Sequence, residues 1–276
     1  MDKTKKPEDS HILMPKFMLK HFEVNNKYCY YDVKGNFIGT KGHAASTNTE
    51  KGYYSSDMED DLNTLIETPF SRLLYSIYNN IHSEKTFVLT DEDILVLKNF
   101  AIATVARSPV LHETFMKQPF YHAQFFMDIH DEQLMHDQAV FYGMIAANDS
   151  GYLDNFIITF LENRTDMPFV LPVRGLYSFF ETKKPIMLLP IDPHTAIMYI
   201  HKDLADRVFN QAGQQYKFYV DHEEQIFRYN LSAVIAQCRD NWGRVVSADK
   251  ALLERLKVEY HILMDEYNKN KPEGAE

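Results

Sequence analysis

The sequence has few of the residues on which several large enzyme classes depend. It contains 10 glycines and 2 cysteines, Cys29 and Cys238, in 276 residues. It forms no phosphate-binding loop, dinucleotide-binding fingerprint or G-x-S-x-G turn, which argues against kinases, GTPases, simple dehydrogenases and α/β-hydrolases. Two cysteines are too few for a metal centre built from thiolates alone.

Long apolar runs are also absent. No stretch of about 18 uncharged apolar residues occurs, so the sequence predicts no membrane-spanning helix. The N-terminal segment MDKTKKPEDS is charged and lacks the apolar core of a signal peptide. Together with the scarcity of cysteine, these features predict a cytoplasmic protein with no membrane partner.

Basic residues are fewer than acidic ones. Lys and Arg total 29, Asp and Glu total 39, and the formal charge is −10. Proteins that coat nucleic acid are more often basic, so a DNA-packaging role is disfavoured, whereas a nuclease with a local basic patch is not excluded. Aromatic residues, by contrast, are plentiful: 19 Phe and 17 Tyr predict a core rich in rings.

The order of patterns predicts one α+β domain over residues 10–267, with loose tails at 1–9 and 268–276. The N-terminal half is expected to be rich in helices, with an early β-hairpin. The C-terminal half is expected to hold a small mixed sheet and closing helices. A polar, irregular segment is expected over 43–54.

The expected elements follow from periodicity and from turn residues. The helices are expected at 14–22, about 57–67, 72–82, 91–106, across 110–148, and at 202–212, 223–239 and 249–267. The strands are expected at 27–33, 37–38, 156–161, 169–171, 186–189 and 195–200.

Two helix boundaries carry specific signals. Ser56 or Asp57 is expected to cap the helix that ends near residue 67, and Thr68-Pro69 is expected to interrupt or kink it. Thr90 and Asp93 form a capping box for a helix that is apolar nearly all round, which predicts a buried central helix.

Glu59, Asn63 and Glu67 recur every four residues and therefore share one side of a helix. On an α-helical wheel Glu59 lies near the apolar edge, whereas Glu67 points well away from it. Two carboxylates at this spacing could bind a divalent cation or act as acid and base. The alternative is an ordinary solvated helix face.

A second polar stripe lies between Tyr121 and Asp137. Gln124, Asp128, Glu132 and His136 recur every four residues, as ligands of a metal could if another element supplied the rest. The spacing is not that of a zinc-protease helix. The alternative is an exposed polar face.

Arg107 and His112 resemble the R-x4-6-H motif of HEPN ribonucleases, in which the pair serves attack by a ribose 2′-hydroxyl. Pro109 is expected to break the helix between them. In the alternative interpretation, Arg107 closes the buried helix and bonds its last carbonyls.

The segment that begins SHILMPKFMLKHF offers further polar candidates. His11 can exchange a proton near neutral pH. Lys16 and Lys20 lie one helical turn apart and could hold a phosphate. The alternative is a packed helix with both lysines in solvent.

The pattern His11, Pro15-Lys16, Leu19-Lys20, Phe22, followed by the strand YCYYDVKG, resembles the start of the uncharacterised domain-of-unknown-function family 4238. The resemblance continues through the helix of Glu59 and Glu67, through Arg107-Ser108-Pro109, and through Asn230 in a late helix. The resemblance implies that these distant polar residues converge on one pocket.

The chain departs from the family pattern in two places. Members place the His three residues before the Pro, whereas His11 lies four residues before Pro15. Members also carry a Ser-Asp-x-Pro element, and its best match here is Thr182-Lys183-Lys184-Pro185, which lacks the Asp.

The sequence therefore predicts a polar pocket that acts on a phosphate-containing substrate, as a metal-dependent nuclease or another phosphate-ester-processing enzyme. The expected partner is nucleic acid or a phosphate-containing small molecule. The cofactor is not identified, although two carboxylates would suit Mg²⁺ or Mn²⁺. The alternative is a non-catalytic interaction or regulatory module whose exposed aromatics bind another protein; the sequence alone leaves both open.

The roles expected for an enzyme can be assigned to particular residues. His11 or Glu67 would act as the base, and Glu59 and Glu67 would hold the metal. Arg107 would act at the catalytic centre as a phosphate contact. Lys16 and Asn230 would bind the substrate.

Overall fold

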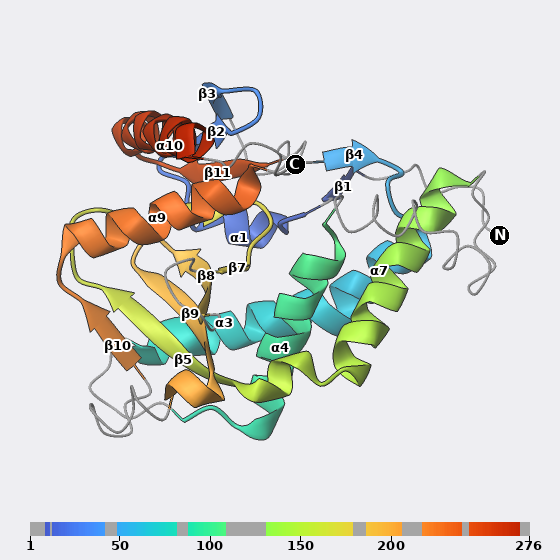
Figure 1. Cartoon of the computed structure of the whole chain (residues 1–276). Helices are drawn as coiled ribbons and strands as arrows, with labels where there is room; N and C mark the ends of the chain where they lie inside the picture. The colour runs from blue at the N-terminus through green and yellow to red at the C-terminus, as the bar shows by residue number, and fades with distance from the viewer. Residues whose placement is uncertain are drawn as a thin grey trace.

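Residues 9–11, 13–41, 49–81, 88–108, 131–178, 186–205, 217–238 and 243–270 are described by a computed structural model of the chain. Helices lie on one side of the molecule and sheets with two further helices on the other, which confirms the predicted α+β class (Figure 1). None of the helices in these ranges is long and apolar enough to cross a membrane.

The described strands form three sheets. The small sheet pairs β1 (Asp9–His11) with β4 (Thr49–Lys51). The five-stranded sheet has the order β10 (Lys217–Val220), β5 (Phe156–Asn163), β9 (Thr195–His201), β8 (Ile186–Asp192), β7 (Tyr177–Ser178). The four-stranded sheet has the order β3 (Phe37–Lys41), β2 (Tyr28–Asp32), β11 (Arg244–Ser247), β6 (Leu171–Pro172).

The predicted mixed sheet and early hairpin are both present. In the five-stranded sheet, β10 runs parallel to β5 and the other neighbours are antiparallel. β2 and β3 form the hairpin, and its turn contains Asn36 at φ 52°, a left-handed conformation that Asn tolerates better than most residues. The segment 43–54 was expected to be irregular, and this was wrong for Thr49–Lys51, which pairs with β1.

The described helices are α1 (Lys16–Lys20), α2 (Ser56–Asp61), a π-helix (Leu62–Glu67), α3 (Thr68–Ile81), α4 (Asp91–Ala106), α7 (Glu132–Asp149), α9 (Glu223–Gln237) and α10 (Lys250–Asn270), with a short 3₁₀ turn at Tyr152–Asn155. They confirm the expected helices at 14–22, 57–67, 223–239 and 249–267, with shifts of a few residues at the ends.

The expected interruption at Thr68-Pro69 is wrong. α2, the π-helix and α3 follow one another without a break, and Pro69 occupies the first turn of α3. The cap also differs by one residue, because the Ser55 hydroxyl accepts the Met58 N–H at 3.2 Å. The capping box at Thr90 and Asp93 is confirmed.

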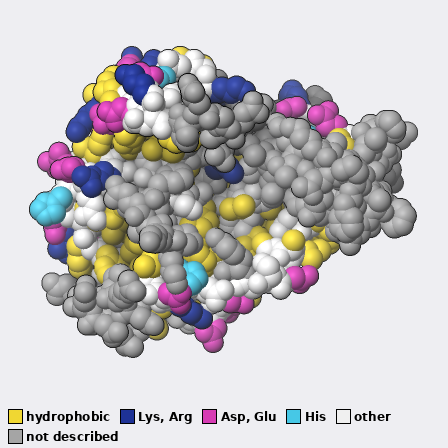
Figure 2. All heavy atoms as spheres, viewed as in Figure 1, with side chains coloured by type: hydrophobic (Ala, Val, Ile, Leu, Met, Phe, Trp, Pro, Cys, Tyr) yellow, Lys and Arg dark blue, Asp and Glu magenta, His cyan; other side chains and the backbone are white. Residues whose placement is uncertain are grey.

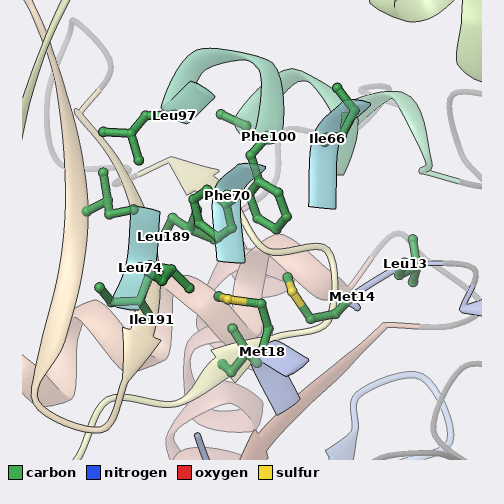
Figure 3. Packing of buried hydrophobic residues seen from close by; sticks show 14 of the residues in the cluster. Leu13, Met14, Met18, Ile66, Phe70, Leu74, Leu97, Phe100, Leu189 and Ile191 are labelled. Atoms are coloured by element: carbon green, nitrogen blue, oxygen red, sulfur yellow. The ribbon is translucent and has the colours of Figure 1, made fainter. Parts of the chain in front are cut away.

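The helices enclose a core of rings and aliphatic side chains. Phe70 of α3 and Phe100 of α4 stack with their ring centroids 3.6 Å apart. Met18 and Leu13 approach from the N-terminal segment and Leu189 from β8 (Figure 3). Seven of the 16 residues of α4 are buried, six of them from Phe100 onward, so the predicted buried central helix is confirmed in its second half.

Candidate functional site

The loop of residues 52–55, which leads into α2, is held by the first turns of α7. Gln133 Nε2 donates to the carbonyl oxygens of Gly52 at 2.8 Å and of Tyr54 at 2.9 Å. One side-chain amide thereby satisfies two main-chain acceptors of a loop about 80 residues away in sequence. The position of Tyr54 is thus fixed by α7.

Two further residues of α7 hold the same loop. The His136 ring stacks on Tyr53 with the centroids 3.8 Å apart, and its Nδ1 lies 3.1 Å from the Tyr53 carbonyl oxygen. The Asp137 carboxylate accepts the Ser55 N–H at 3.1 Å. Of the predicted polar stripe, His136 therefore holds this loop together with its neighbours Gln133 and Asp137, whereas Gln124 and Asp128 lie outside the described residues.

The π-helix decides where Glu67 points. Four residues overshoot a full α-helical turn, whereas a π-helix, with its i→i+5 hydrogen bonds, turns less per residue, so four residues fall short of a turn. The excess rotation about the helix axis from Glu59 to Asn63 is therefore largely cancelled by the shortfall in rotation from Asn63 to Glu67. The wheel prediction that Glu67 points away from the core is wrong, because that wheel assumed an uninterrupted α-helix.

Glu67 instead reaches a buried arginine. Its Oε1 accepts a hydrogen bond from Arg107 Nη2 at 2.5 Å, and the side chain of Arg107 is only 3% exposed. Arg107 Nη1 lies 3.4 Å from the Leu13 carbonyl oxygen. Arg107 follows the last turn of α4, where its own N–H bonds the Ala103 carbonyl. Its guanidinium thus joins α4, the π-helix and the N-terminal segment, rather than bonding the carbonyls of its own helix.

Acidic neighbours keep this arginine charged. Burial alone favours the neutral form, but the charge and hydrogen bond of Glu67 and the charge of Glu59 outweigh it and raise the pKa of Arg107. Burial also raises the pKa of Tyr54 far above its usual value, although Arg107 opposes the shift. Tyr54 is therefore a neutral hydroxyl at physiological pH, and the site carries one cation between two carboxylates.

Two buried donors beside this ion pair have no hydrogen-bond partner among the described residues. They are Arg107 Nε and the Ser108 hydroxyl, and Ser108 is fully buried. An unpaired buried donor costs free energy. The two groups belong to consecutive residues, and each would be stabilised by an acceptor oxygen.

The N-terminal candidates are placed differently. The backbone of His11 lies in β1, opposite Thr49, and two residues before Leu13; its side chain is outside the described part of the structure. Lys16 begins α1 and is exposed. The segment therefore reaches the ion pair through a main-chain oxygen of Leu13.

Asn230, which is predicted to bind substrate, makes structural hydrogen bonds instead. Its side-chain oxygen accepts the Val170 N–H at 2.9 Å, and its amide nitrogen donates to the Pro168 carbonyl at 2.8 Å. The residue is fully buried in α9. These bonds hold the chain that enters β6, so the structure does not bring Asn230 to the Arg107 cluster.

A metal at the predicted carboxylates would need ligands from elsewhere. Within the described residues, no group of three or more His, Cys, Asp and Glu side chains could hold a metal ion. Glu67 already binds Arg107 through one oxygen. His112 and the segment 182–185, which were expected to bear on activity, lie outside the described residues.

Three parts of the cluster could not be found from spacing: Tyr54, the Ser108 hydroxyl and the Leu13 carbonyl. Tyr54 ends the segment expected to be polar and irregular, Leu13 lies in apolar sequence, and Ser108 is notable only because it follows Arg107. No residue pattern indicated the π-helix that turns Glu67 toward Arg107.

The comparisons with known proteins give a family. The chain matches the family model described as "Protein of unknown function (DUF4238)" over residues 11–251. No curated protein and no solved structure matches it. The matched region includes Glu59, Glu67, Arg107 and Asn230 and covers most of the sequence. The chain therefore belongs to the DUF4238 family.

Proposed function

We propose that the chain is a metal-dependent phosphate-ester hydrolase, with nucleic acid as its expected substrate, and that Glu59, Glu67 and Arg107 form its centre. The observation that carries the proposal is the buried, charged Arg107, whose Nε–H lacks a partner among the described residues, as does the hydroxyl of the next residue, Ser108. A guanidinium donor in a dry site is well suited to a phosphate oxygen.

The carboxylates explain why the site would need a cation. A phosphate next to Glu59 and Glu67 is repelled unless a positive charge lies between them. Mg²⁺ is commonly held by one or two carboxylates together with substrate phosphate oxygens and water. When bound there, Mg²⁺ or Mn²⁺ would lower the pKa of a bound water for attack on phosphorus.

Each residue of the proposed centre would then have its own role in hydrolysis. In hydrolysis a bond forms between the water oxygen and phosphorus, the bond to the leaving oxygen breaks, and the water gives up a proton. Glu59 would hold the cation or take the proton, and Glu67 is bound to Arg107 through one oxygen. Glu67 would orient Arg107, and Arg107 with Ser108 would donate to the phosphate.

The test is cleavage of labelled RNA and DNA by purified protein, with Mg²⁺ or Mn²⁺ and with chelator. We expect metal-dependent cleavage that falls about 10²- to 10³-fold in Glu59→Gln and in Arg107→Lys. The matched controls are Asp61→Asn and Arg72→Lys, exposed residues of the same helical run, which should keep full activity.

Circular dichroism of each variant separates loss of chemistry from loss of fold. No cleavage by the wild-type protein with either metal would overturn the proposal. Cleavage that survives in both site variants would show that another protein or another site is responsible.

A further inference from the structure

α7 has apolar residues on two opposite sides. On one side Ala139 and Val140 are buried as the helix packs against α4. On the other, Leu134, Phe141 and Ile145 are 39%, 53% and 40% exposed. Steps of seven and four residues place these three on one helix face, which we call the α7 stripe.

The α7 stripe is flanked by acidic residues: on the helical wheel Asp131, Asp137 and Asp149 lie about 60° to either side of it, whereas Glu132 lies on the opposite side. Residues 131–155 contain no Lys or Arg but five acidic residues, Asp131, Glu132, Asp137, Asp149 and Asp154. The nearby Lys98 of α4 is paired with Asp154 at 2.6 Å. Figure 2 shows hydrophobic and acidic side chains side by side on the lower right of the molecule, where the C-terminal end of α7 lies.

We propose that the α7 stripe binds a short amphipathic helix of another protein, with an apolar side and flanking Lys or Arg residues. The stripe spans about 16 Å, the length over which a helical peptide presents anchors at i, i+4, i+7 and i+11. Basic flanks would complement the acids around the stripe and speed association. This role is separate from the proposed hydrolase centre.

Charge and size disfavour the other occupants. A second copy would bring the same acidic residues together across an isologous contact, and three side chains cover far less than the roughly 800 Å² per partner of a standard interface. A membrane with anionic lipids would be repelled by the acidic rim. A basic helix would instead be attracted by these acids.

The test uses fluorescence anisotropy with three synthetic helical peptides. One has Leu anchors and Lys flanks, one has the same anchors with Glu flanks, and one is a scrambled Lys peptide of equal charge. We expect the first to bind best, and its affinity to fall about tenfold or more in Phe141→Gln/Ile145→Gln. Val258→Gln, an exposed apolar position on α10, is the matched control and should not change binding.

Charge is tested separately with Asp149→Lys, which should reduce the preference for the Lys-flanked over the Glu-flanked peptide. Equal binding of the scrambled peptide would overturn the proposal, because charge alone would then suffice. So would a dimer, or binding to phosphatidylserine vesicles, that is abolished by Phe141→Gln/Ile145→Gln. All substituted positions are exposed at the surface, so the substitutions should not unfold the protein.

Discussion

At the scale of single residues, Arg107 illustrates that a buried charge needs a charged partner and hydrogen bonds. An ionised side chain that leaves water is costly unless it is paired and hydrogen-bonded. Arg107 meets this demand through Glu67 and the Leu13 carbonyl, which lie far apart in sequence. The same contacts tie three separate elements together, so the pair is structural whether or not it is catalytic.

Removing one partner of the Arg107–Glu67 pair should lower the free energy of unfolding more than removing both. Glu67→Leu leaves Arg107 buried beside an apolar side chain, and we expect the free energy of unfolding to fall by about 3–5 kcal/mol. Arg107→Met should cost a similar amount. The double variant Glu67→Leu/Arg107→Met should recover most of the loss, as measured by urea unfolding in a double-mutant cycle.

An additive double variant would contradict this expectation, because it would mean that the two side chains act independently. Arg72→Met, at an exposed position of α3, serves as the control for loss of a surface arginine and should change stability by less than about 0.5 kcal/mol.

Asp192, at the end of β8, should make stability depend on pH. Burial raises its pKa above the usual 3.8, although hydrogen bonds from His194 and Thr195 oppose the shift. The native state therefore holds this proton more tightly than the unfolded chain, so the charged form is penalised. The penalty is absent below the usual pKa and grows as the pH rises through the raised one.

Asp192→Asn keeps an acceptor for the His194 N–H and removes the charge. We expect wild-type stability, relative to this variant, to fall as the pH rises from about 4 to about 7. Chemical denaturation at several pH values measures the difference. A difference that rises with pH would show that the folded-state pKa is lowered instead.

At the scale of elements, the sequence predicts what local chemistry decides. The capping box of Thr90 and Asp93, the β2–β3 hairpin and the buried second half of α4 all follow from residues within a few positions of each other, and all are confirmed. β10 and β11, of four residues each, were missed because their pairing partners, β5 and β2, are distant in sequence.

The π-helix, like β10 and β11, depends on contacts with residues that are distant in sequence. Its sequence, Leu62–Glu67, contains no Pro or Gly that would mark an irregular helix. It is stabilised by what flanks it: the Arg107–Glu67 pair on one side and the core residues Phe70, Leu74 and Ile77 of α3 beyond it. A helical wheel drawn from the sequence contains no information about such tertiary contacts, so it cannot predict the π-helix.

A π-turn is equivalent to one extra residue in an α-helix, which makes a deletion test possible. Deleting the exposed Thr64 should turn the π-helix into regular α-helix while Glu59, Glu67 and α3 keep their positions. Deleting the exposed Tyr75 should instead rotate Ile77 and Ile81 out of the core, at about 1.5–3 kcal/mol for each side chain. Thermal unfolding followed by circular dichroism compares the two; equal destabilisation would contradict the interpretation.

At the scale of the whole molecule, the five-stranded sheet joins two cores. Successive side chains of a strand point to opposite faces, and β9 shows this alternation. Ile197 and Tyr199 lie in the core shared with α3 and α4, whereas Met198 and Ile200 lie in the core shared with α9 and α10. Neither core can be lost without exposing one face of this sheet.

We therefore expect one cooperative unfolding transition, as the predicted single domain over 10–267 requires. Phe100→Ala in the first core and Leu253→Ala in the second should each cost about 2–5 kcal/mol and lower the same melting temperature. Calorimetry gives the criterion, since the calorimetric and van't Hoff enthalpies agree in a two-state transition. Two resolved transitions, each moved by only one of the substitutions, would mean that the cores unfold as separate domains despite the shared sheet.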